Sequence, residues 1–325
     1  MEFSSRRSFL IRSAAAATVL GSMPRGLLAD PLGRSPGIQL YTVAAALNAD
    51  VPGTLGALHT IGYRIVESAG FANLPAKDFR KALDDAGLNC PSAHLRFNAE
   101  DPGPLFADAN AVGAHYAVSS LLLPPGVQMA RDLSVLTSIT LEDFKRTAEL
   151  ANKIGAKAKQ AGLQYAYHNH NYEFRDQGNG QTGYDLLLKE TDPALVKFEL
   201  DCGWMIASGH RPEDYFRLYP DRYRLLHIKD FVAGSKVTTD LRGANRPKGT
   251  ELGRGYIDYK PIFAAAKAAG IDYYFSEQEP PIVGMTALEA AKINYDYMHA
   301  LKRDGCRSEF AWFPLRQRFI LRPFT

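Results

Sequence analysis

Short apolar segments alternate with longer amphipathic ones along most of the chain, and this pattern predicts eight strands, nearly all followed by a helix. The predicted strands are Gly37–Thr42, Tyr63–Glu67, Leu88–Leu95, His115–Leu123, Leu163–His170, Val196–Asp201, Tyr223–Ile228 and Asp272–Glu277. The predicted helices lie near Pro52–Ile61, Ala76–Ala86, Pro104–Val112, Leu141–Ala161, Tyr184–Lys189, Pro212–Leu218, Tyr259–Ala269 and Thr286–Leu301. Strands and helices in alternation are typical of a parallel sheet covered by helices.

A glycine stands between a predicted helix and the next strand at four places, namely Gly62, Gly87, Gly162 and Gly270. Glycine ends a helix there because it adopts the left-handed conformation without a steric cost. Eight such units favour a closed barrel over an open doubly wound sheet, which would place a glycine-rich phosphate turn after its first strand. The segment after that strand, residues 41–44, has no glycine. We therefore predict an α/β fold, a single-domain (β/α)8 TIM barrel over residues 30–302.

Composition and charge narrow the class of protein. The chain has 325 residues, of which 46% are hydrophobic and 22% charged, so it is not a disordered chain. Its formal net charge is +3. The first 29 residues hold four arginines and one glutamate, and residues 303–325 hold five arginines and two acidic residues. The body between them is therefore slightly acidic, which argues against nucleic acid as a partner.

The N-terminus has the pattern of an export signal. Ser5-Arg6-Arg7-Ser8-Phe9-Leu10 is followed by a small apolar segment, and this arrangement resembles a twin-arginine signal over residues 1–29. The alternative is a short amphipathic helix. The apolar segment is too short to span a bilayer, so we expect a periplasmic or otherwise exported protein with no membrane partner after signal removal. Residues 303–325 form a C-terminal extension to which we assign no role.

Polar and titratable side chains gather where the predicted strands end. They are Gln39, Tyr41, Glu67, His94, His168, His170, Glu173, Glu199, Asp201, His227, Lys229, Glu277 and Glu279. In a TIM barrel the active site lies at this end of the strands. One such residue alone is usually structural, but acidic groups and imidazoles at four successive strand ends would meet at one rim, where unpaired charges are costly. An oxygen and nitrogen ligand set of this kind suits a divalent metal ion.

Cysteine does not contribute to this chemistry. The three cysteines are Cys90, Cys202 and Cys306, too few for a disulfide framework and without zinc-finger spacing. Cys90 and Cys202 lie in apolar segments, which predicts buried structural thiols.

The body of the chain resembles the xylose isomerase-like TIM barrels described as sugar phosphate isomerases/epimerases. The strings that carry the resemblance are Tyr167-His168-Asn169-His170-Asn171-Tyr172-Glu173-Phe174, Leu200-Asp201-Cys202-Gly203-Trp204, His227-Ile228-Lys229-Asp230, Leu252-Gly253-Arg254-Gly255 and Ser276-Glu277-Gln278-Glu279. The resemblance extends from about residue 37 to residue 301. It implies one divalent metal ion, with Mn²⁺ favoured and Mg²⁺, Co²⁺ or Zn²⁺ as alternatives.

The resemblance also implies which residues hold that metal. In the family the ligands are a Glu, an Asp, a His and a Glu from strands five to eight, and the last three correspond to Asp201, His227 and Glu277. The fifth predicted strand contains no carboxylate at the corresponding stretch, residues 165–168. Either Glu173 reaches the metal from the loop, or His168 or His170 replaces the glutamate. We favour Glu173.

A metal site of this kind acidifies the proton next to a substrate carbonyl by stabilising the enediolate. Glu173 and Glu277 are the expected catalytic acid–base pair. The expected substrate-binding residues are Glu67, His94, His168, His170 and Lys229.

The leading hypothesis is thus a divalent-metal-dependent sugar isomerase or epimerase. The first alternative is a lyase or hydrolase of 3-keto-glycosides or inosose-like polyols at the same site, and the second is a non-catalytic periplasmic sugar binder. A fourth hypothesis is a DNA repair enzyme of the related endonuclease IV type. It would need three zinc ions and a basic face, and the slightly acidic body argues against it. The expected partner is a small sugar or polyol, with no nucleic acid, and a homo-oligomer is left open.

Overall fold

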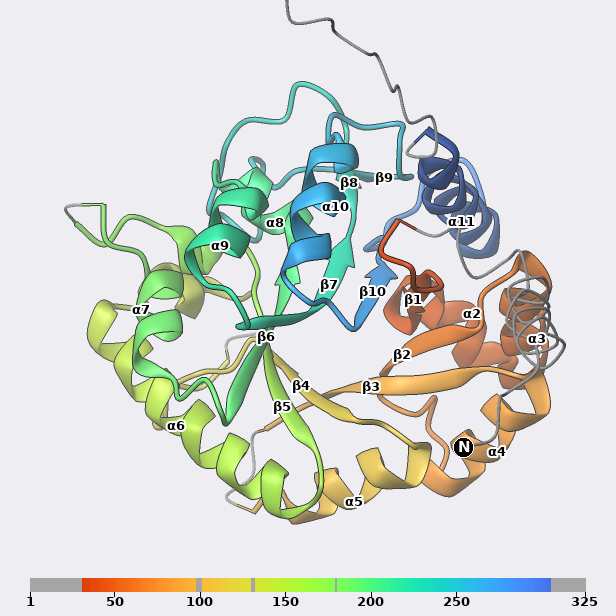
Figure 1. Cartoon of the computed structure of the whole chain (residues 1–325), viewed down its shortest axis with the longest axis horizontal. Coiled ribbons are helices and arrows are strands. Elements are labelled where there is room, and N and C mark those ends of the chain that lie inside the picture. Colours follow the sequence, from red (N-terminus) through yellow and green to blue (C-terminus); the bar gives the residue numbers. More distant parts are fainter. Residues whose placement is uncertain (1–30, 98–100, 130–131, 179, 305–325) are drawn as a thin grey trace, which may run out of the picture.

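Eight parallel strands close into a barrel in a computed structural model that describes residues 31–97, 101–129, 132–178 and 180–304 (Figure 1). Around the barrel the strands follow the order β1-β10-β7-β6-β5-β4-β3-β2. They are β1 (Gly37–Gln39), β2 (Ile65–Ala69), β3 (Asn89–Leu95), β4 (Tyr116–Ser120), β5 (Gln164–His168), β6 (Val196–Asp201), β7 (Tyr223–Ile228) and β10 (Tyr273–Ser276). The predicted TIM barrel is confirmed.

Helices cover the outside of the barrel (Figure 1). They are α2 (Ala44–Ala49), α3 (Val51–Ile61), α4 (Ala76–Ala86), α5 (Gly103–Val112), α6 (Leu141–Gln160), α7 (Gly183–Glu190), α8 (Cys202–Ala207), α9 (Pro212–Leu218), α10 (Tyr259–Ala268) and α11 (Ala287–Asp304). All eight predicted helices are present, and their bounds differ by at most a few residues from the prediction. Gly87 ends α4 in the left-handed conformation at φ 69°, which is the predicted role of a glycine at this point.

Apart from the short 3₁₀ helices, the sequence pattern missed three features, all in segments that connect a barrel strand to the next predicted helix. Two are the short helices α2 and α8, and the third is the two-stranded antiparallel sheet of β8 (Asp230–Phe231) and β9 (Gly249–Thr250). These elements are six residues or fewer, too short for a hydrophobic period to be recognised. The predicted first strand also ends early, because Gln39 accepts a hydrogen bond from the backbone N–H of Tyr41 and starts a 3₁₀ turn over Leu40–Val43.

The core has two parts. The larger part lies between the strands and the surrounding helices. The smaller part fills the barrel interior and consists of Tyr116, Val118, Ala166, Leu225 and Phe275. This interior layer, which we call the apolar plug, supports the polar residues that follow it along the same strands.

Cys90 and Cys202 are buried free thiols, as predicted. No helix among the described residues is long and apolar enough to cross a bilayer. The expected export signal of residues 1–29 and nearly all of the C-terminal extension lie outside the described residues.

Candidate metal centre and active site

Every second residue of a strand points to the same face of the sheet. This period of two residues brings the polar residues together above the apolar plug. Ala166 and Leu225 belong to the plug. His168 and His227 stand two residues further along β5 and β7, so their side chains enter the same interior one layer higher. Both are almost completely buried. The barrel interior therefore changes from apolar to polar within two residues along each strand.

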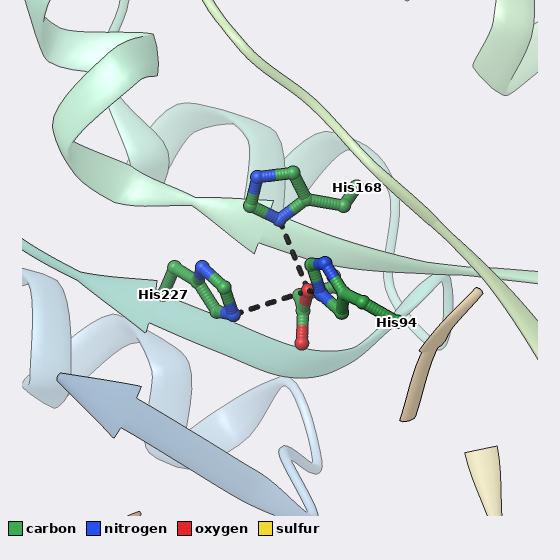
Figure 2. Close-up of side chains that lie close together, drawn as sticks. His94, His168 and His227 are labelled. Carbon is green, nitrogen blue, oxygen red and sulfur yellow. Dashed lines mark hydrogen bonds and ion pairs between the residues drawn. The ribbon is translucent and has the colours of Figure 1, made fainter. Parts of the chain in front are cut away.

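Glu199 of β6 lies at the centre of three histidines. Its Oε2 atom is 2.7 Å from Nε2 of His94, 3.0 Å from Nδ1 of His168 and 3.2 Å from Nε2 of His227. Figure 2 shows the three rings converging from different strands on one carboxylate. Burial and the nearby Glu67 carboxylate raise the pKa of Glu199 to about 7, although His227 and His94 oppose this shift.

A second carboxylate, Glu67 of β2, completes this layer. Its Oε2 atom lies 2.6 Å from Nε2 of His227 and accepts a hydrogen bond of 2.8 Å from the Gln39 amide. The Ser92 hydroxyl donates to its other oxygen. Burial alone would lower the pKa of His94, but the carboxylates of Glu67 and Glu199 outweigh it and raise that pKa to about 10. The imidazolium of His94 thus partly balances the buried negative charge.

Four side chains on neighbouring strands form a compact set of potential metal ligands. In His168, Asp201, His227 and Glu277, one ligand atom of each residue lies within 4.8 Å of those of the others, and all four side chains are buried. His94, His168, Glu199 and His227 form an overlapping group that shares two histidines with the first. The structure thus brings three predicted ligands together with His168.

The donor chemistry of this set fits a divalent metal ion. Two imidazoles and two carboxylates are borderline-to-hard ligands of the type that Mn²⁺, Zn²⁺, Co²⁺ and Mg²⁺ accept in different proportions. Next to the set, Oε1 of Glu199 is buried and has no hydrogen-bond partner among the described residues. A buried carboxylate oxygen without a partner is costly unless a cation or water binds it. His168, Asp201, His227 and Glu277 are therefore the residues that could hold the metal.

Lys229 joins the metal ligands to the pocket above them. Its Nζ atom lies 2.8 Å from Oδ2 of Asp201, 2.7 Å from Oε2 of Glu277 and 2.9 Å from Oε1 of Glu279. Burial would lower the pKa of Lys229, but these three carboxylates raise it well above its usual range. The side chain is therefore an ammonium ion. Gly203 leaves room for its stem, because a Cβ at this position would lie 2.2 Å from Cγ of Lys229.

A pocket of about 440 Å³ opens above Lys229 and Glu277. Residues 243, 244 and 246–249, which precede and enter β9, form one wall, and residues 280, 281 and 283 form another. Arg246 pairs with Glu279 across this pocket, and the Trp204 indole donates a hydrogen bond of 3.0 Å to the same carboxylate. The pocket gives small molecules a route to the buried ligand set.

Glu173, which we expected to bind the metal, lies in neither group of potential ligands. Its two oxygens accept hydrogen bonds from the Tyr167 hydroxyl at 3.1 Å and from the backbone N–H of His170 at 3.0 Å. Burial raises the pKa of Glu173 to about 8. His170 lies beside the site, with its ring 5.0 Å from that of His168, and burial lowers its pKa to about 4.

The string Leu252-Gly253-Arg254-Gly255 has a structural role. The backbone N–H groups of Gly253, Gly255 and Ile257 all donate to the Asp230 carboxylate. A Cβ on Gly255 would lie 2.1 Å from that carboxylate. This contact fixes the segment after β9 against the residue that follows Lys229.

Glu199 and Glu279 were recognised at the strand ends but were assigned no role, and Arg246 was not among the predicted residues at all. A role for Glu199 was recognisable in principle, because it stands two residues before Asp201 on one strand and must face the same way. Arg246 follows no strand of the barrel and lies in a long irregular segment, so no sequence period places it.

Comparison with known proteins identifies the family. A model of the xylose isomerase-like TIM barrel matches residues 55–283, which is more than half of the chain. The chain belongs to the xylose isomerase-like TIM barrel family. The resemblance that the sequence motifs carry is thereby confirmed at the level of the family.

Proteins with similar sequences or structures include enzymes. Inosose dehydratase from Lacticaseibacillus casei is 32% identical over 154 residues, which cover 43% of this chain and 49% of that protein. The chain thus matches about half the length of this curated relative. A sugar phosphate isomerase/epimerase from Parabacteroides distasonis has a TM-score of 0.65 and 26% identity, and the match covers 86% of this chain and 96% of that one.

A third protein is similar at the level of the fold. A xylose isomerase-like TIM barrel protein from Mycobacterium smegmatis, whose structure is a complex with magnesium, has a TM-score of 0.55 and 16% identity. The match covers 85% of this chain and 98% of that one.

Proposed function

We propose that this protein is a divalent-metal-dependent lyase that removes water from a keto-polyol or keto-sugar. The observation that carries the proposal is the set of His168, Asp201, His227 and Glu277, with ligand atoms within 4.8 Å of one another below a pocket of about 440 Å³. In such a reaction a C–H bond next to the carbonyl breaks and its electron pair forms a C=C bond. The neighbouring C–O bond then breaks, and the hydroxyl leaves with a proton as water.

His168, Asp201, His227 and Glu277 would hold the metal ion. When bound, the ion supplies Lewis-acid stabilisation of negative charge on the substrate oxygens. We assign proton removal to Glu277, because it lines the pocket and is the only one of these four ligands to do so. Lys229 also lines the pocket, 2.7 Å from Glu277, and its ammonium group can donate a proton to the leaving oxygen.

The placement of Glu173 favours a lyase over an epimerase. Inversion at a carbon needs an acid or base on each face of the substrate, and we expected Glu173 and Glu277 in these roles. The Glu173 carboxylate instead accepts hydrogen bonds from Tyr167 and from the His170 backbone. An elimination needs only one base and one acid, which Glu277 and Lys229 provide. The 32% identity to an inosose dehydratase supports this choice.

Isomerisation or epimerisation is the second candidate, and one observation favours it. The structure of the sugar phosphate isomerase/epimerase from Parabacteroides distasonis superposes on 86% of this chain with a TM-score of 0.65 and 26% identity. Both reactions begin with removal of a proton next to a carbonyl, so they share the metal site and differ in the fate of the intermediate.

A proton-exchange experiment in D₂O tests the proposal. The protein is loaded with Mn²⁺ to turn over 2-keto-myo-inositol and a panel of keto-sugars, and products are followed by mass spectrometry and by NMR after the metal is removed. We expect metal-dependent loss of water from at least one compound. Deuterium incorporation with an isomerised product would favour the second candidate. Binding without exchange or product would contradict both and indicate a sugar binder.

We also propose that residues 1–29 direct export to the periplasm. The support is the sequence Ser5-Arg6-Arg7-Ser8-Phe9-Leu10 before a small apolar segment. In a bacterial host with a twin-arginine system, replacing both Arg6 and Arg7 by Lys should retain the protein in the cytoplasm. Unchanged delivery of this variant to the periplasm would contradict the proposal.

A further inference from the structure

The pocket above the metal ligands has two chemically different parts. Its floor is polar and is formed by Lys229, Glu277 and Glu279, which contact one another through the ion pairs described above. Its other lining side chains include three apolar ones: Pro247, which is buried, and Pro281 and Val283, which are exposed and form the outer wall. Val283 is 80% exposed, the largest exposed fraction among the large hydrophobic side chains that the structure describes.

The charges of the pocket cancel one another. Three basic side chains line it, Lys229, Arg246 and Lys248, together with three acidic ones, Asp230, Glu277 and Glu279. Lys229 is paired with Glu277 and Glu279, and Arg246 is paired with Glu279. Phosphate sites in proteins combine several unpaired donors or cations. Here Lys229 and Arg246 are already neutralised, and Lys248 is the one cation of the pocket without an ion pair among the described residues, so the pocket favours an uncharged ligand over a sugar phosphate.

The size of the pocket exceeds that of one sugar ring. A ring with its hydroxyls has about 12 non-hydrogen atoms and, at the packing density of organic solids, fills no more than about half of this volume. Pockets of several hundred Å³ bind larger molecules and use apolar walls for most of the contact area. A ring that reaches Glu277 at the floor leaves the outer, apolar part of the pocket for a second group.

We propose that Pro247, Pro281 and Val283 form a subsite for an apolar substituent on an uncharged sugar, so that the substrate class is a glycoside with an aromatic or aliphatic aglycone. This inference rests on the proposed function in one respect, because it places the sugar ring at Lys229 and Glu277. It goes further in naming the second group of the substrate and in excluding a phosphate.

Binding of unreactive glycosides tests this subsite without catalysis. Methyl β-glucoside, phenyl β-glucoside and glucose 6-phosphate are titrated into the Mn²⁺-loaded protein by calorimetry. We expect the phenyl glucoside to bind at least tenfold more tightly than the methyl glucoside, and glucose 6-phosphate to bind no better than the methyl glucoside. Val283→Asp should abolish the advantage of the phenyl group while leaving methyl glucoside binding unchanged.

Val237→Asp is the matched control, because Val237 is 71% exposed and does not line this pocket. It should retain the tenfold preference. The inference is overturned if neither glucoside binds, if both bind equally, if glucose 6-phosphate binds most tightly, or if Val283→Asp retains the preference. Glycoside binding with no proton exchange on any keto substrate would refute the proposed function and leave the subsite standing. Proton exchange on a keto substrate without tighter binding of the phenyl glucoside would refute the subsite and leave the proposed function standing.

Discussion

The Nε2 atom of His227 lies 2.6 Å from the Oε2 atom of Glu67, although these residues are 160 positions apart and belong to non-adjacent strands of the barrel. The contact spans the barrel interior and is fully buried at both ends. Glu67 therefore orients one of the proposed metal ligands, His227, from across the barrel interior. A carboxylate that hydrogen-bonds a metal-ligating histidine, without binding the metal itself, fixes the orientation of the imidazole ring and raises the basicity of that ring.

Glu67→Gln should destabilise the metal-free protein by about 3 kcal/mol, because it removes one of the buried carboxylates that balance the imidazolium charge. Glu142→Gln is the matched control, since Glu142 forms an exposed pair with Lys145. Its effect should be within about 0.5 kcal/mol. Urea unfolding in the presence of a chelator measures both. Equal effects of the two substitutions would show that the buried contact contributes little.

His168→Gln should weaken Mn²⁺ binding by about 100-fold, because it removes one of four proposed ligands. Glu173→Gln should leave Mn²⁺ affinity within about twofold, because its carboxylate lies outside both groups of potential ligands. Electron paramagnetic resonance, which detects free Mn²⁺, gives the dissociation constants of both variants. The reverse result would restore Glu173 as the ligand from the fifth strand.

Removal of metal should lower the thermal unfolding midpoint, because an ion that binds only the folded state stabilises it in proportion to the logarithm of its concentration. At a free Mn²⁺ concentration 100 times the dissociation constant, the gain is about 2.7 kcal/mol. Asp201→Asn should lose most of this gain, since Asp201 is one of the proposed ligands. Scanning calorimetry measures the unfolding midpoint of both proteins with chelator and with added Mn²⁺. If Mn²⁺ raises the midpoint of the variant as much as that of the wild type, Asp201 is excluded as a ligand.

Gly203→Ala should destabilise the protein by about 1–3 kcal/mol and reduce turnover, because the new Cβ would lie 2.2 Å from Cγ of Lys229 and displace that side chain. Gly56→Ala in α3 is the control, since no atom lies within 4 Å of a Cβ there. It should be neutral or stabilise by about 0.5–1 kcal/mol. Chemical unfolding and steady-state kinetics measure the pair. A harmless Gly203→Ala would mean that Lys229 can move without cost.

The buried Glu173 carboxyl should make stability fall as pH rises. Its pKa is about 8 in the folded protein, against a usual value of 4.5. Between these values the folded state holds a proton that the unfolded state has lost, so the unfolding free energy decreases by up to about 1.4 kcal/mol per pH unit from this group. Glu173→Gln removes this contribution. Unfolding at pH 5.5 and pH 7.5 should therefore show a smaller decrease in the variant, and identical slopes would contradict the assignment.

The strands, the helices and the polar strand ends were predictable because each depends on local sequence. The period of two places Asp201 and Glu199 on one face, and glycines such as Gly87 mark helix ends through their own backbone freedom. The closed barrel followed from counting these units. His227 and Glu277 then had to meet at one rim, since parallel strands end at the same side of a barrel.

The partners of each polar group were decided by tertiary structure. The short 3₁₀ helix Tyr172–Phe174 turns Glu173 back toward its own loop and away from the potential metal ligands, and no sequence period encodes that turn. The contact between Arg246 and Glu279 joins an irregular segment to the end of the last barrel strand. The sequence by itself therefore determined the barrel and the rim on which its chemistry gathers. Only the three-dimensional packing decided which carboxylate faces which cation, because that choice depends on distances of a few ångströms between residues far apart in the chain.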